Sequence, residues 1–229
     1  MAAVQAFYAF YTLYESLNGG VGDLGPFSGL EDVARRVYLE EGALAVSDTQ
    51  RVSLFITWKK RERLRGCIGT FGRLPAARAV QRYALVSALE DSRFPPIQLR
   101  ELPELHCTCN ILDNFTIIYS KQQDSTGGPQ DIFDWDVGTH GVELKFRDPW
   151  SHTLRSATFL PEVMLEQHWD KRATFENLVQ KAGCSDGAAQ HIVDHYEKYF
   201  VEVIRYEGYA TEIAYPEFMR KWSNALPTD

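Results

Sequence analysis

The sequence of 229 residues lacks a long uninterrupted apolar run. Its most apolar N-terminal stretch, 4–17, contains Glu15, is too short to span a bilayer, and follows no basic segment of the kind that opens a secretion signal. The sequence therefore predicts neither a membrane span nor a secreted precursor. We expect the protein to work in the cytoplasm, the nucleus or both, with no membrane involved.

Cysteine and positive charge are also scarce. Four cysteines in 229 residues do not make a disulfide framework, which indicates a protein kept reduced inside the cell. Lysine and arginine total 24 against 31 aspartates and glutamates, which gives a net charge of −7. That balance disfavours a nucleic-acid binder, because affinity for phosphates depends on basic residues. Hydrophobic residues make up 45% of the chain, enough to bury a core as one large domain or two smaller lobes.

The apolar residues follow a mixture of strand and helix periods. The clearest strand is 51–60, where alternate residues from Val52 to Trp58 are apolar. A charged turn leads to a second strand, 64–71, so the two should form an antiparallel hairpin. Further strands are expected at 106–112, 142–146, 153–159 and 200–213, and helices at 4–17, 30–41, 75–91, 160–169, 174–182, 188–199 and 215–222. This pattern predicts an α+β fold with antiparallel sheets flanked by helices.

Two motifs suggest cofactor or metal binding, and neither has the required context. Gly20, Gly22 and Gly25 have the spacing of a dinucleotide loop, but they follow a predicted helix instead of a strand. Cys107 and Cys109 share one face of a predicted strand, but no second pair of ligands has a useful spacing for zinc. We therefore expect no cofactor and no metal, with the two cysteines packed in a core.

Two further features have an ordinary and a functional interpretation. The charged turn at 59–63 contains four basic residues, which either keep a hairpin tip solvated or form a site for an anionic partner. His140 lies between Gly138 and Gly141, where close approach to the backbone is possible. It is either a turn residue or a general base, because imidazole titrates near neutral pH.

Cys67 has the most suggestive surroundings of the four cysteines. It lies in a predicted strand between Gly66 and Gly69, which leave room for a ligand to approach the backbone. Strand alternation places Arg65 on the same face, roughly 7 Å away along the strand. A cation near a thiol favours the nucleophilic thiolate. The same glycines also fit a bulge or a close packing point, so both interpretations stay open.

The stretch Leu64-Arg65-Gly66-Cys67-Ile68-Gly69-Thr70-Phe71 resembles the hallmark of the AMMECR domain family, named for the Alport syndrome, midface hypoplasia and elliptocytosis chromosomal region. The resemblance continues in order along nearly the whole chain. Its further blocks are Asp91-Ser92-Arg93-Phe94-Pro95-Pro96, Glu101-Leu102-Pro103-Glu104-Leu105, Asp134-Trp135-Asp136-Val137-Gly138, His140-Gly141-Val142 and Ala157-Thr158-Phe159-Leu160-Pro161.

The resemblance implies a single domain over residues 1–229 built as two α+β lobes. The larger lobe would use both chain ends, approximately 1–75 plus 140–229, and the smaller, 76–139, would be inserted between them. The strand that carries Cys67 would face a crevice between these lobes. The resemblance implies no particular reaction.

Two functions follow as hypotheses. The first is a cysteine-dependent enzyme acting on a small or anionic substrate, with Cys67 as nucleophile and His140 as base. Its binding residues would be Arg65, Gly66, Gly69, Thr70, Asp91 and Arg93. The alternative is a non-catalytic module that binds a protein partner or regulates it, in which the strand around Cys67 is structural. The sequence specifies neither the substrate nor the partner.

Overall fold

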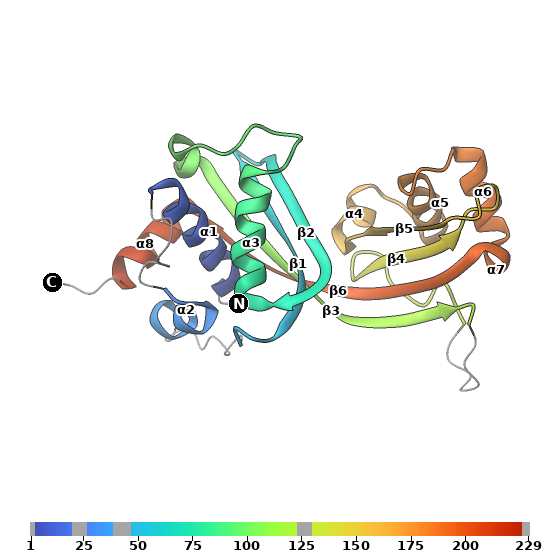
Figure 1. Ribbon diagram of the computed structural model, residues 1–229, viewed down its shortest axis with the longest axis horizontal. Helices are drawn as coiled ribbons and strands as arrows, with labels where there is room; N and C mark the ends of the chain where they lie inside the picture. Colours follow the sequence, from blue (N-terminus) through green and yellow to red (C-terminus); the bar gives the residue numbers. More distant parts are fainter. Residues whose placement is uncertain (1–2, 20–26, 39–46, 123–129, 226–229) are drawn as a thin grey trace. The chain divides into compact units, whose positions relative to one another are not determined.

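The computed structural model describes residues 3–19, 27–38, 47–122 and 130–225. The chain divides into two compact units: unit 1 comprises Met1–Ile111 and Tyr209–Asp229, and unit 2 comprises Leu112–Gly208. The six described strands form an antiparallel sheet in the order β2-β1-β3-β6-β4-β5, with helices packed against it (Figure 1). The predicted α+β fold with antiparallel sheet pairing is therefore confirmed.

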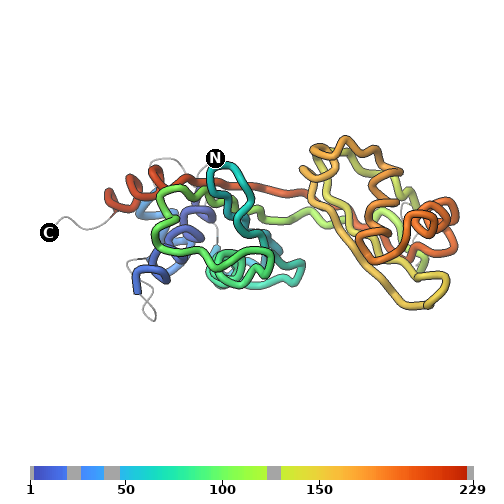
Figure 2. The backbone as a smooth tube through the Cα atoms, turned by 90° about the horizontal axis from the view of Figure 1, so that it is seen from above, coloured from blue at the N-terminus to red at the C-terminus, as the bar shows by residue number. Residues whose placement is uncertain are grey.

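Unit 1 is organised around a long hairpin of strands β1 (Arg51–Lys60) and β2 (Arg63–Pro75). Helix α3 (Ala76–Leu89) starts where β2 ends and packs against both strands. Helices α1 (Val4–Leu17) and α8 (Tyr215–Ala225) come from opposite ends of the chain and lie side by side, as Figures 1 and 2 both show. The two chain ends therefore help to build the same core.

The core of unit 1 is rich in aromatic residues because α1 is apolar on almost every side. Phe10 stacks on Phe218 of α8, with 4.8 Å between ring centroids, and meets Trp58 of β1 edge-on at 5.3 Å. The indole N–H of Trp58 donates to Ser87 Oγ in α3 at 3.0 Å, which satisfies a polar atom in a buried place. Two short elements complete the described part of unit 1, namely helix α2 (Leu30–Val37) and the 3₁₀ helix η2 (Leu99–Glu104).

Unit 2 has its own core under a second hairpin. Strands β4 (His140–Arg147) and β5 (Leu154–Phe159) pair antiparallel, and β4 also pairs with β6 (Phe200–Ala214). The fourth strand is β3 (Leu105–Ser120), and both β3 and β6 cross the boundary between the units. The helices of unit 2 are α4 (Pro161–Glu166), α5 (Lys171–Lys181), α6 (Asp186–Asp194) and α7 (Tyr196–Tyr199).

Several predicted elements differ in length from those observed. The strand predicted at 106–112 continues to Ser120, because hydrogen bonding to β6 outweighs the turn preference of Asp113 and Asn114. The helix predicted at 188–199 is two helices, since the chain leaves helical geometry at His195. The compact units are also bounded differently from the lobes expected at 1–75 plus 140–229 and 76–139, and those lobes stay a prediction.

No helix within the described ranges is long and apolar enough to cross a membrane.

Candidate functional site

Cys67 lies on β2, which is an edge strand of the sheet. Its side chain is neither fully buried nor fully exposed, and it faces Thr57 directly across the hairpin. The Thr57 hydroxyl donates a hydrogen bond to the Cys67 sulfur at 3.1 Å. Thr57 and Cys67 thus form a cross-strand pair that fixes the thiol while leaving it partly accessible.

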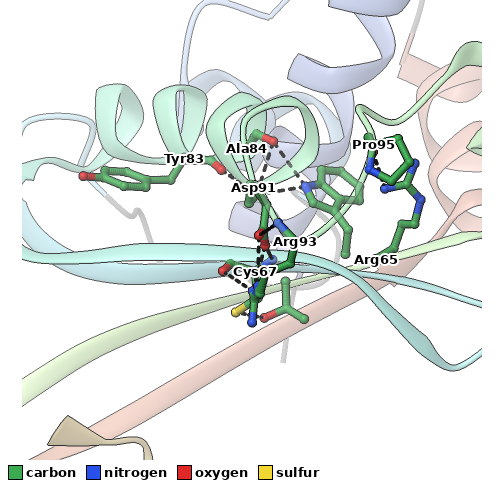
Figure 3. Close-up of polar contacts among 10 residues, drawn as sticks. Arg65, Cys67, Tyr83, Ala84, Asp91, Arg93 and Pro95 are labelled. Atoms are coloured by element: carbon green, nitrogen blue, oxygen red, sulfur yellow. Dashed lines mark hydrogen bonds and ion pairs between the residues drawn. The ribbon is translucent and has the colours of Figure 1, made fainter. Parts of the chain in front are cut away.

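The backbone of Cys67 is held on its outer side by two side chains from the segment after α3. Its N–H donates to Asp91 Oδ2 at 2.9 Å, and its carbonyl accepts from Arg93 Nη2 at 3.0 Å (Figure 3). An edge strand leaves such groups without a neighbouring strand. The carboxylate and the guanidinium take the place of that strand, so the position of the thiol is set by rigid backbone contacts.

Asp91 and Arg93 also bind each other in a two-pronged arrangement. Arg93 Nε donates to Asp91 Oδ1 at 2.9 Å, and Arg93 Nη2 donates to Asp91 Oδ2 at 2.7 Å. These charge-assisted bonds, with further help from the Cys67 N–H, hold the pKa of Asp91 far below its usual range. Asp91 is therefore a permanent anion at neutral pH and not a proton donor. The Arg93 side chain is 55% exposed, so its guanidinium can still reach a ligand.

Arg65 is turned away from the neighbourhood of the Cys67 thiol. In the hairpin register Trp58 pairs with Gly66 and Lys59 with Leu64, which leaves Arg65 as the extra residue of a β-bulge. Bulges redirect side chains, and regular alternation does not hold there. The prediction that Arg65 and Cys67 lie on one unbroken strand face is therefore wrong, because the bulge changes the direction of the Arg65 side chain.

The Arg65 guanidinium is fully engaged in unit 1. Its Nε and Nη2 donate to the two carboxylate oxygens of Glu101 at 3.1 and 3.0 Å, and its Nη1 donates to the carbonyl of Pro95 at 2.7 Å. Arg65, with the Gln98 N–H and Lys60, lowers the pKa of Glu101 to about 2. Arg65 therefore fastens the hairpin to the segment that contains η2, and the cation nearest the Cys67 backbone is Arg93.

The two glycines beside Cys67 are surrounded by the chain's own atoms. A Cβ on Gly66 would lie 2.0 Å from the Ser87 carbonyl oxygen of α3, and one on Gly69 would lie 2.4 Å from the Phe55 ring. The space expected to admit a ligand is thus occupied by the backbone of α3 at Gly66 and by the ring of Phe55 at Gly69. Thr70 is also engaged, since its hydroxyl accepts from the Gly72 N–H at 2.9 Å.

The two cysteines of β3 were the candidate metal ligands in the sequence. Cys107 and Cys109 are completely buried, and burial raises the pKa of both thiols. Within the described ranges, no group of three or more His, Cys, Asp or Glu side chains could hold a metal ion. The motif of Gly20, Gly22 and Gly25 lies outside the described residues.

His140 belongs to unit 2, whereas Cys67, Asp91 and Arg93 belong to unit 1. Its Nδ1 accepts a hydrogen bond from the Asp136 N–H at 2.9 Å, which ties the ring to the preceding turn. The side chain of His140 thus contacts Asp136, a residue of the adjoining turn. Gly141 is required at its position because a Cβ there would lie 2.3 Å from the Tyr206 ring.

Two residues of this site have no role in the sequence-based hypotheses. Glu101 was visible only as part of a block resembling the family, and nothing in the spacing linked it to Arg65. Thr57 faces Cys67 because of the bulge: an unbroken register from the turn would place it opposite Gly66. The sequence predicts a strand and its turn, but it does not predict the one-residue shift in register that the bulge causes.

These observations define an α+β protein with a partly accessible thiol on an edge strand, held by a carboxylate–guanidinium pair. The family model described as AMMECR1 matches residues 28–209, which is most of the chain. The chain belongs to the AMMECR1 family.

Relatives of known sequence support this assignment. An uncharacterized protein of Saccharomyces cerevisiae is 47% identical over 229 residues, covering 94% of this chain and 87% of its own length. An uncharacterized protein of Arabidopsis thaliana is 37% identical, covering 72% of each chain. The crystal structure of the uncharacterized protein PH0010 from Pyrococcus horikoshii matches with a TM-score of 0.66 and 21% identity, covering 94% of this chain and 92% of that one. At that identity the likeness concerns the fold alone.

Proposed function

We propose that the protein is a cysteine-dependent enzyme that acts on a small anionic substrate. The observation that carries the proposal is the pairing of a partly accessible thiol, Cys67, with a partly exposed guanidinium, Arg93, through the Cys67 carbonyl. A thiol supplies a nucleophile and a guanidinium binds a carboxylate or phosphate group. Together they match a substrate with an electrophilic carbon near a negative charge.

Each neighbouring group has a distinct part in this proposal. The Cys67 thiol loses its proton to solvent, and the thiolate adds to a carbonyl carbon of the substrate while the electron pair of the C=O π bond moves to the carbonyl oxygen. Thr57 orients the sulfur through its hydroxyl hydrogen bond of 3.1 Å. Asp91 is a positioning residue, because its carboxylate binds both the Cys67 N–H and Arg93. Pre-organisation of this kind favours reaction by holding the nucleophile in one place.

His140 remains the base of the sequence-based hypothesis, and its assignment is a separate proposal. Replacement of His140 by glutamine should lower turnover without changing thiol alkylation if it acts as that base. None of the described cysteines is joined in a disulfide, which suits a reducing compartment such as the cytoplasm or nucleus.

Turnover of a small molecule tests the enzyme proposal directly. Wild-type protein, Cys67→Ser and Cys184→Ser would each be incubated with a small-molecule cell extract, and metabolite changes would be followed by mass spectrometry. Cys184 is the matched control, since it is another partly buried thiol but lies in unit 2. We expect a compound to be consumed by wild type and Cys184→Ser and spared by Cys67→Ser. Equal profiles for all three proteins would reject the enzyme.

A non-catalytic binding module is the second candidate, and it too has a specific observation in its favour. Arg65 is saturated by Glu101 and Pro95, and the spaces at Gly66 and Gly69 are filled by the chain itself. These contacts fit a strand whose residues serve close packing. In that case Cys67→Ser should leave every metabolite unchanged, and the protein should act through a surface elsewhere.

A further inference from the structure

The tip of the β1–β2 hairpin takes no part in the proposed thiol chemistry. Lys60 pairs with Arg63, so the turn consists of Arg61 and Glu62 alone. Both have positive φ, 50° and 62°, which is the geometry of a type I′ turn. Such turns strongly favour Asn-Gly, because residues with larger side chains are strained in the left-handed region. The chain thus keeps two long charged side chains at a place where smaller residues fit better.

Beside this turn the surface is hollowed. A cavity of about 450 Å³ is lined by Lys60, Arg61, Arg63, Leu64 and Arg65. Four of the five lining residues are cations, although the whole chain carries a net charge of −7. The hollow is therefore a local site of positive charge on an acidic protein, and it attracts negative groups.

The charges in the hollow are only partly neutralised by the chain. Lys60 and Arg65 share the carboxylate of Glu101, with 3.0 Å in each ion pair, and Arg61 pairs with Glu104. Arg63 is exposed, and its side chain has no hydrogen bond or ion pair to any part of the chain that the structure describes. Two carboxylates thus pair with three of the four cations, and Arg63 is the cation left for an incoming anion.

An apolar contact accompanies this charge. Leu64, next to Arg63 in the lining, is 43% exposed, which is high for a large hydrophobic side chain. A free phosphate or carboxylate ion would use the cations and leave Leu64 in water. A peptide that carries both acidic and apolar side chains would use both.

We propose that this hollow, defined by Lys60, Arg61, Arg63, Leu64 and Arg65, binds an acidic peptide segment of a protein partner that also presents an apolar side chain. The carboxylates of the partner contact Arg63 and the outer face of Arg61, and its apolar side chain covers Leu64. This goes beyond the thiol chemistry, and it holds whether or not Cys67 is a nucleophile.

Binding of a defined peptide to the full chain tests the proposal. The probe is a short fluorescein-labelled peptide of alternating glutamate and leucine, followed by anisotropy and by amide shifts in NMR spectra. We expect shifts centred on residues 60–65 and an affinity that falls as salt is added. The same peptide with glutamine in place of glutamate should bind weakly, and so should a glutamate peptide with serine in place of leucine.

Variants locate the site. Arg63→Glu should weaken binding about tenfold, because an attraction becomes a repulsion. The matched control is Arg73→Glu, an exposed arginine on the same strand outside the hollow, which should bind as wild type. The double change Arg61→Asn with Glu62→Gly keeps the net charge and suits the type I′ turn, so it should melt no lower than wild type while binding the peptide more weakly.

Several outcomes overturn the proposal. They are absence of binding by wild type, equal losses for Arg63→Glu and Arg73→Glu, equal binding of the glutamine peptide, and shifts at 60–65 produced by inorganic phosphate or anionic lipid vesicles but not by the acidic peptide. None of these outcomes bears on Cys67, because every readout is independent of turnover.

Discussion

Two strands of unit 1 carry cysteines, and the surroundings of these cysteines are opposite in character. On the inner strand β3, Cys107 and Cys109 are completely buried, and burial raises their pKa. On the edge strand β2, Cys67 is partly accessible, accepts a hydrogen bond from Thr57 and has its backbone bound by a carboxylate and a guanidinium. The position of a strand in the sheet thus decides whether its cysteine is buried and unreactive or accessible enough to act as a nucleophile.

The largest loss of stability should come from adding a side chain at Gly66, on the face of β2 that packs against α3. Gly66→Ala puts a methyl group 2.0 Å from the Ser87 carbonyl, so α3 must move away from the hairpin. We expect a loss of about 3 kcal/mol in the free energy of unfolding, measured by denaturant titration. Gly72→Ala on the same strand, whose nearest neighbour is the Thr70 hydroxyl at 3.2 Å, should cost far less. Equal losses would mean that α3 does not depend on Gly66.

Asp91→Asn should give the next largest effect. It keeps the shape of the side chain but removes the charge that binds Arg93 and the Cys67 N–H. The side chain of Asp91 is buried while that of Arg93 is half exposed, so solvent screens the pair in part and we expect a loss of about 2 kcal/mol.

The control is Asp194→Asn, which breaks the exposed ion pair with Arg172 and should change stability little. The alkylation rate of Cys67 should also change in Asp91→Asn, because the thiol loses its fixed position. If that rate stays at the wild-type value, Asp91 does not position the thiol.

A pair of serine substitutions sharpens the contrast between the strands. Cys109→Ser places a hydroxyl in an apolar interior and should cost about 1 to 2 kcal/mol. Cys67→Ser should cost less than about 0.5 kcal/mol, because the Thr57 hydroxyl and solvent can both bond to the new oxygen. Thermal melting of the two variants is the measurement. A larger loss for Cys67→Ser would favour the structural role of the motif.

The last effect concerns Glu101 and depends on pH. Its folded pKa of about 2 lies below the ordinary 4.5, so the carboxylate contributes stability that is present above about pH 4.5 and lost as pH falls toward 2. Glu101→Gln should remove about 1 kcal/mol at neutral pH and flatten this part of the pH–stability curve. Glu62→Gln, at the exposed turn, should leave the curve unchanged. A variant curve parallel to that of wild type below pH 4.5 would contradict the role of Glu101.

Much of the fold could be predicted because it depends on periodicity. The apolar pattern of Val4–Leu17 and the alternation in Arg51–Lys60 gave those elements with their observed bounds. The continuation of β3 could not be predicted in this way, because it depends on a partner strand distant in sequence.

The candidate site could be predicted from the sequence only in part. Resemblance to the family brought Asp91 and Arg93 to attention, but their bonds to the Cys67 backbone depend on how the segment after α3 folds back. The role of Arg65 was expected from regular alternation, and the bulge directs it to Glu101 instead. A single extra residue in a strand carries no sequence signal strong enough to predict such a change.

The most direct test of the central claim is the native-state alkylation rate of each cysteine. Iodoacetamide would be added to the folded protein at neutral pH, and the modified peptides would be quantified over time by mass spectrometry. The account predicts rapid modification of Cys67, slower modification of Cys184, and protection of Cys107 and Cys109 until the protein unfolds. A Cys67 thiol as protected as Cys107 and Cys109 would contradict it.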